Sequence, residues 1–253
     1  MASKYCRPSD IITDSATISL TSGSADGSYP LSNLYDRYAH TVFKSVGTSC
    51  TIRAVFGAAK TLQAIALINH KLAGATVTVT NSAGFSRALT IPSNSEDGHC
   101  IDPWDTYVSL ANTSATTWTI TITGAATVVA IGELLLIQTL RTMNFQRGGT
   151  EAEQHGVISQ QTDYGVRRKY ELGVRQRVKA GELILTETLR DDLIALARDA
   201  KGPKKNFLLV PDDADNDALF VELATNPREL ARQGPFASTV TLEFVEQQKG
   251  LAL

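Results

Sequence analysis

Strict alternation of apolar and polar residues is the sequence feature that most constrains how this chain can fold. It is clearest in residues 117–123, where threonines separate Trp118, Ile120 and Ile122, and it recurs in residues 75–80. Successive side chains of a β-strand point to opposite faces of the sheet, so each segment has one face for a core and one for water. The alternation predicts a mainly β protein.

The first half of the chain contains short alternating or apolar segments separated by Gly, Ser, Thr, Asn and Pro. Residues 62–69 are rich in Ala, Ile and Leu, which predicts a more completely buried strand. Strands spaced by about 8–12 residues with few helices are typical of a sandwich or a barrel. A jelly-roll-like sandwich is expected for residues 1–138.

A polar stretch at residues 139–163 is expected to be a linker or an extended arm. The segment 164–253 is expected to be a second β-rich domain with strands near 169–179, 207–210, 218–223 and 239–244. Residues 186–200 predict one packed helix, because Leu189, Leu193 and Leu196 share a face and Gly202 with Pro203 follows its end.

Composition excludes several classes of protein. The 24 basic and 26 acidic residues nearly balance, so no global field draws the chain to nucleic acid or to an anionic membrane. The longest apolar stretch, 128–137, is interrupted by Gly132 and Glu133 and is shorter than the roughly 20 residues of a membrane span. The first residues of the chain contain no apolar run typical of a secretory signal. The three cysteines of the chain predict reduced thiols in a cytoplasm.

Motifs that carry chemistry are missing. The sequence has no Gly-x-Ser-x-Gly, no phosphate-binding Gly-x-x-x-x-Gly-Lys and no Gly-x-Gly-x-x-Gly, and its four histidines are scattered singly. The acidic segment 213–217 lacks the Gly and Glu of a calcium loop. We therefore expect no enzyme activity, no metal and no cofactor. The sequence leaves open a glycosidase-like pair of catalytic carboxylates among Glu96, Asp97, Asp102 and Asp105. Solvated acidic residues in a loop explain these four positions better.

Residues 28–37, Ser-Tyr-Pro-Leu-Ser-Asn-Leu-Tyr-Asp-Arg, followed by Thr-Val-Phe-Lys-Ser at 41–45, carry a family resemblance. This opening is similar to that of phage virion proteins with a discoidin-like, galactose-binding-like sandwich. Phe43 stands where that pattern usually has Trp, which keeps an aromatic plug but removes the indole donor. The second half resembles the ring-forming domains of siphophage distal tail proteins.

The resemblance implies a structural virion protein of a tail tip or baseplate, assembled in the bacterial cytoplasm. It would form a hexameric or trimeric ring that joins the tail tube to the baseplate hub or receptor-binding parts, without nucleic acid or membrane insertion. A basic strand face is the candidate oligomer interface, with the acidic segment 212–217 of an adjacent copy as its complement. A solvated face that needs no partner is an equally favoured interpretation. The candidate interface residues are Arg167, Arg168, Lys169, Arg175 and Arg177.

The alternative function is a carbohydrate-binding module that attaches to a host-surface glycan. Its candidate contacts are His70, Trp104 and Tyr107, because Trp104 and Tyr107 fall in a predicted loop where flat rings could stack on a sugar. The other interpretation is that these rings plug the end of the sandwich, and it is favoured because Trp is highly buried on average. A glycosidase or an esterase attached to a tail is the third class.

Overall fold

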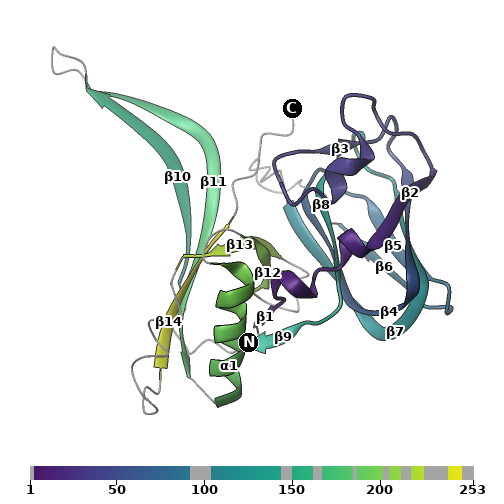
Figure 1. Ribbon diagram of the computed structural model, residues 1–253. Coiled ribbons are helices and arrows are strands. Elements are labelled where there is room, and N and C mark those ends of the chain that lie inside the picture. Colours follow the sequence, from purple (N-terminus) through teal and green to yellow (C-terminus); the bar gives the residue numbers. More distant parts are fainter. Residues whose placement is uncertain are drawn as a thin grey trace.

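Two antiparallel seven-stranded sheets and one α-helix form the described part of the chain (Figure 1). The computed structural model describes residues 3–91, 104–143, 150–161, 167–184, 187–201, 205–211, 218–224 and 239–246. The expected class, a mainly β chain with a sandwich and a second β-rich part carrying one helix, is confirmed. No helix within the described ranges is long and apolar enough to cross a membrane.

The first sheet forms the sandwich and has the strand order β3-β8-β4-β7-β5-β6, with β2 paired to β4. Its strands are β2 (Ala16–Ser22), β3 (Phe43–Lys44), β4 (Cys50–His70), β5 (Thr76–Asn81), β6 (Ser86–Thr90), β7 (Trp104–Thr123) and β8 (Ala130–Ile137). Three short 3-10 helices precede or join them: η1 (Pro8–Asp10), η2 (Thr13–Ser15) and η3 (Leu31–Leu34).

The long strands β4 and β7 run through both layers of the sandwich. Their register shifts between Val55 and Lys60 and again between Leu62 and Ala64. Irregularities of this kind bend a strand, so one sheet can fold over and pack against itself. A single apolar cluster accordingly holds buried residues of β4, β5, β7 and β8, with Leu89 of β6 packed against it and Trp118 among its largest fully buried members.

Strand β8 separates two hydrophobic clusters. Leu134 and Leu136 belong to the sandwich core, whereas Leu135 and Ile137 belong to a second cluster shared with the other sheet. Alternate residues of a strand face opposite sides, so both faces of β8 are covered. This explains why its sequence is an almost continuous apolar run instead of an alternating one.

The second sheet has the order β10-β11-β14-β13-β12-β1-β9. Its strands are β1 (Ser3–Tyr5), β9 (Arg141–Met143), β10 (Thr150–Gln161), β11 (Arg167–Ile184), β12 (Phe207–Val210), β13 (Leu219–Leu223) and β14 (Thr239–Glu246). The helix is α1 (Glu187–Ala200), and its position agrees with the sequence prediction.

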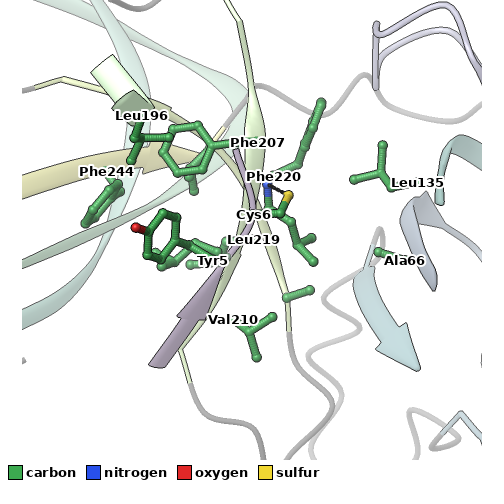
Figure 2. Close-up of a cluster of buried hydrophobic side chains, with 14 of the residues drawn as sticks. Tyr5, Cys6, Ala66, Leu135, Leu196, Phe207, Val210, Leu219, Phe220 and Phe244 are labelled. Carbon is green, nitrogen blue, oxygen red and sulfur yellow. Dashed lines mark hydrogen bonds between the residues drawn. The ribbon is translucent and has the colours of Figure 1, made fainter. Parts of the chain in front are cut away.

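The helix packs on the second sheet through its apolar face. Leu196 is fully buried in the same cluster as Tyr5, Phe207 and Phe244, and the last two rings meet edge to face at 6.0 Å (Figure 2). Ala66 of the sandwich belongs to this cluster as well, so one apolar core joins the two sheets. Burial of this area drives the packing of the sheets against each other.

The sheets do not follow the expected order of the chain. Strand β1, from the first residues of the expected sandwich segment, lies in the second sheet between β9 and β12. The segment 139–163, expected as a linker or arm, supplies β9 and β10. The division into 1–138, 139–163 and 164–253 as separately folding units stays a prediction, which limited proteolysis would test.

Candidate functional site

A cleft of about 550 Å³ lies between the sandwich and the second sheet. Asp14, Arg37 and Tyr38 line it from the sandwich side, and Lys205 and Glu222 line it from the second sheet. Concave surfaces that combine a few polar groups with apolar or aromatic ones are where small ligands bind most often. The cleft is therefore one candidate site.

Arg37 shapes the sandwich wall of the cleft. Its backbone is left-handed, with φ of 68°, and its N–H donates to Oε2 of Glu133 at 2.9 Å. Its guanidinium donates to the carbonyl oxygen of Ile11 and to the carboxylate of Asp14, each at 3.1 Å. A non-glycine residue keeps this conformation only where its surroundings hold it. These bonds fix the loop that presents Tyr38, whose side chain is 57% exposed.

Glu133 of β8 anchors this loop as a buried carboxyl group. It is completely buried, and burial raises its pKa to about 9, although the guanidinium of Arg37 offsets part of the increase. At neutral pH Glu133 is therefore protonated. A neutral acid costs much less to bury than a carboxylate, and it still accepts the N–H of Arg37.

The same loop is held against the sandwich at Ala39. A Cβ at Gly132 would clash with the carbonyl oxygen of Ala39, so this close approach requires glycine. The side-chain amide of Asn69 donates a hydrogen bond to that same carbonyl, and Asn69 itself has a left-handed backbone with φ of 51°. The loop is thus fastened to the end of β4 and to β8.

A buried carboxylate links the two walls behind the cleft. Asp105 of β7 is 1% exposed and accepts the backbone N–H of Asn69 at 2.8 Å and that of Phe220 at 3.2 Å. Asn69 lies on β4 and Phe220 on β13, so Asp105 connects the sandwich to the second sheet. A buried N–H group without an acceptor is costly, so these two hydrogen bonds stabilise the junction of the sheets.

The wall from the second sheet offers polar groups to a ligand. Within the described residues, no hydrogen bond or ion pair is made by the side chains of Lys205, Asn206 or Glu222. Three carboxylates and two basic groups line the whole cleft. These charges almost balance, so the lining of the cleft has little net charge.

The second candidate site is an arm formed by β10 and β11. The two strands curve away from the rest of the second sheet as a ribbon (Figure 1). Strand β14 pairs with β11 only over residues 178–184, so in the described part of the chain residues 167–177 pair with β10 alone. Strand β10 is an edge of the sheet.

The structure places all five candidate interface residues on β11 and gives each a cross-strand partner position on β10. Arg167 lies opposite Gln161, Arg168 opposite Gln160, Lys169 opposite Ser159, Arg175 opposite His155 and Arg177 opposite Glu153. Their side chains lie outside the described ones. The acidic segment 212–217, expected as their complement, also lies outside the described residues.

The structure brings the candidate carbohydrate contacts together but does not expose those it describes. His70 lies opposite Trp104 in the β4–β7 register, yet His70 and Tyr107 are both completely buried. His70 Nε2 lies 2.8 Å from Thr106 Oγ1, and Tyr107 belongs to the core between the sheets. Contact of these two residues with a surface glycan was therefore wrong, because β4 and β7 are covered on both faces here. The side chain of Trp104 lies outside the described ones.

Sequence reasoning missed the cleft, although one signal for it was visible. Glu133 interrupts the apolar run 128–137, and a carboxyl group in such a run must be neutralised or bonded once the strand is buried. Its partner, Arg37, is 96 residues away in the chain. Their meeting depends on the fold, and no local pattern announces it.

The cysteines and acidic residues give no reactive centre in the described part of the chain. Cys6 and Cys50 are buried, and burial raises the thiol pKa values to about 12 and about 11. Thiols of this kind stay protonated and unreactive near neutral pH. Among the described residues, no three His, Cys, Asp or Glu side chains lie together as metal ligands. Cys100, Glu96, Asp97 and Asp102 lie outside those ranges.

No family model matches the sequence, and no curated protein matches it. Solved structures resemble about half of the chain. A mutant of the lectin-binding domain of lectinolysin, complexed with Lewis b, is 12% identical, with 51% of this chain and 95% of that chain covered and a TM-score of 0.39.

Two further structures are similar to a comparable extent. A fucose-binding module of Streptococcus pneumoniae is 11% identical, with 51% of this chain and 98% of that chain covered and a TM-score of 0.40. A family 89 glycoside hydrolase from Clostridium perfringens is 14% identical, with 51% of this chain but 14% of that chain covered and a TM-score of 0.38. Similarity at these values assigns no function to the chain.

Proposed function

We propose that this chain is a non-enzymatic structural subunit that assembles with its neighbours through the β10–β11 arm. The observation that carries the proposal is the length of arm that pairs with nothing beyond itself in the described residues, from residue 167 to residue 177 on β11. A two-stranded ribbon is marginally stable alone in water, and an open edge strand is a template for pairing with another chain. A neighbouring subunit would satisfy both.

The setting of this assembly follows from the family resemblance in the sequence. In its more specific form, the proposal places the chain in a hexameric or trimeric ring at the tail tip or baseplate of a phage. The tail tube and the baseplate hub would be its further partners. In that form the protein resides in the virion. The proposal gives the chain no catalytic residue, no metal and no cofactor.

Removing the outer arm tests this function. Residues 157–171 would be replaced by a two-residue turn. The change keeps the cross-strand pairs from Thr150–Ala180 to Gln154–Gln176 and leaves the pairing of β11 with β14 intact. Multi-angle light scattering should give a discrete multimer for the full chain and a monomer for the shortened one. Unchanged circular dichroism would show that the variant is folded. A full chain that is monomeric at all concentrations, or a shortened chain that assembles normally, would contradict the proposal.

Carbohydrate binding is the second candidate function, and it is favoured by the cleft and not by the buried residues His70 and Tyr107. The cleft pairs the exposed ring of Tyr38 with the unbonded side chains of Asn206 and Glu222. Sugars present both apolar faces and hydroxyl groups, so an aromatic ring beside donors and acceptors suits them.

A glycan array followed by titration calorimetry would test the cleft. Tyr38→Ala should weaken any binding at least tenfold, because it removes the exposed ring. Tyr35→Ala is the matched control, since Tyr35 is 37% exposed and does not line the cleft. Equal affinity for the two variants would exclude the cleft as the glycan site. The arm-shortened variant should bind as the full chain does.

A further inference from the structure

Arg37 contacts two carboxyl groups that differ sharply in their surroundings. Its guanidinium group pairs with Asp14 of η2 at 3.1 Å, while its backbone N–H donates to Oε2 of Glu133 at 2.9 Å. The side chain of Asp14 is 61% exposed, whereas Glu133 is completely buried. One residue thus touches a carboxyl group at the surface and another in the interior, and in the described structure its guanidinium group lies on the first.

The pairing of Arg37 with Asp14 is weak. Nη2 of Arg37 makes this bond and also donates to the carbonyl oxygen of Ile11. The carboxylate is therefore held by one nitrogen instead of by the two-nitrogen fork that gives the strongest arginine pairs. Ion pairs that solvent reaches add little to stability, because water screens them and both side chains lose rotational freedom. The protein consequently loses little when the guanidinium group leaves Asp14.

Glu133 has room for a further hydrogen-bond donor. Its Oε1 is buried and has no hydrogen-bond partner within the described residues. Loss of its proton would leave a buried negative charge held by one N–H, which is costly unless a cation compensates it. Arg37 supplies the positive charge that acts on Glu133, whereas Asp36 and Asp14 oppose its ionisation. His70, at the end of the neighbouring strand β4, already bonds to β7 through its ring.

We infer that the guanidinium group of Arg37 is a two-position switch, which exchanges Asp14 for Glu133 when Glu133 loses its proton. The exchange requires only rotation of one side chain, since Glu133 already contacts the backbone of Arg37. Because burial raises the pKa of Glu133 to about 9, this residue keeps its proton at neutral pH and the guanidinium group lies outward on Asp14. Above about pH 9 the ionised carboxylate draws it inward.

The exchange changes the charge of the cleft. With Arg37 outward, the three carboxylates of the lining are balanced by two basic groups. With Arg37 inward, Lys205 alone balances them, and Asp14 becomes an open acceptor. Ligand and proton binding are linked, so a cation that pairs with Asp14 would in turn favour the ionised form of Glu133. The switch goes beyond the proposed assembly function, and it operates whether or not a glycan binds in the cleft.

Double-mutant cycles at two pH values test the switch. In the full-length protein, Asp14→Asn, Arg37→Gln and Glu133→Gln are combined pairwise and compared by urea unfolding at pH 7 and pH 10, below the concentration at which the protein associates. The coupling of Asp14 with Arg37 should be about two- to fivefold in the unfolding constant at pH 7 and absent at pH 10. The coupling of Glu133 with Arg37 should instead rise by about fivefold between these pH values.

The Glu133→Gln background is the matched control, because glutamine does not ionise. In it, the coupling of Asp14 with Arg37 should be equal at both pH values. A coupling that persists at pH 10 in the unmodified background would overturn the switch, and so would one that disappears in the Glu133→Gln background as well. Unfolding of the unmodified protein at pH 10 while Glu133→Gln stays folded would also overturn it, since ionised Glu133 would then lack a partner. Sedimentation velocity at pH 7 should be normal for every variant, so a failed switch leaves the assembly function standing.

Discussion

Strand β8 and strand β10 differ in what surrounds them. All eight residues of β8 are buried, and its two faces belong to two different apolar clusters. Strand β10 is the edge of its sheet, and its outer half pairs only with β11 in the described structure. The first strand is fixed by the chain's own interior, whereas the second has one backbone edge that pairs with no strand of the described chain.

This difference separates the parts of the molecule that determine stability from the part available for assembly. Apolar burial contributes about 25 cal/mol per Å² removed from water, so strands such as β8 dominate the free energy of folding. The outer arm, in contrast, pairs with no other strand of the described chain. Changes in the core should therefore alter folding, and changes in the arm should alter association.

The largest effect is expected for Trp118→Ala in the sandwich core. Trp118 is fully buried and packs beside Phe85, with ring centroids 6.2 Å apart. Loss of a buried aromatic side chain leaves a cavity and should lower the free energy of unfolding by about 3–5 kcal/mol. Urea unfolding followed by circular dichroism measures this. Thr119→Ala, at the next position on the other face, is the control and should change it by less than about 0.5 kcal/mol.

A smaller loss is expected where the two sheets are joined by Asp105. Asp105→Ala leaves the buried N–H groups of Asn69 and Phe220 without their acceptor, which should cost about 2–4 kcal/mol in unfolding free energy. Asp105→Asn retains one acceptor oxygen and should lose less. If both variants unfold like the unmodified protein, the buried link between β4 and β13 does not contribute to stability.

The pH dependence should depend on Glu133. Its pKa is about 9 in the folded chain and near its ordinary value of 4.5 after unfolding, so the folded state binds more protons between these values. Stability from this group is therefore complete below about pH 4.5 and falls as pH rises towards 9, by on the order of 1 kcal/mol per pH unit. Glu133→Gln keeps an acceptor for Arg37 and should flatten this slope in urea unfolding between pH 6 and 9. An unchanged slope would assign the dependence to other groups.

The smallest effect on stability is expected from the arm. The variant that lacks residues 157–171 should change the free energy of unfolding by less than about 1 kcal/mol, because the removed ribbon pairs with no other strand of the described chain. The measurement is made below the concentration at which the protein associates. A loss comparable to that of Trp118→Ala would mean that the arm belongs to the core, and the contrast with β8 would not hold.

Local patterns were sufficient to predict most of the elements. Alternation predicted the strand of residues 117–123 inside β7, and an apolar face with a Gly-Pro stop predicted α1. The apolar segments predicted β12 and the buried half of β4 as well. These signals arise because periods of 2 and 3.6 residues follow directly from backbone geometry, so they can be read without knowing any tertiary contact.

Tertiary structure alone decided the rest. Strand β1 has three residues, too few to show a period, and its place between β9 and β12 depends on partners more than 130 residues away. His70 and Tyr107 look available in the sequence, but both are completely buried, and Tyr107 lies in the core shared by the two sheets. The cleft around Arg37 and the edge position of β10 likewise depend on which segments meet across the fold. A sequence determines which face of a strand is apolar, but only packing determines what covers that face.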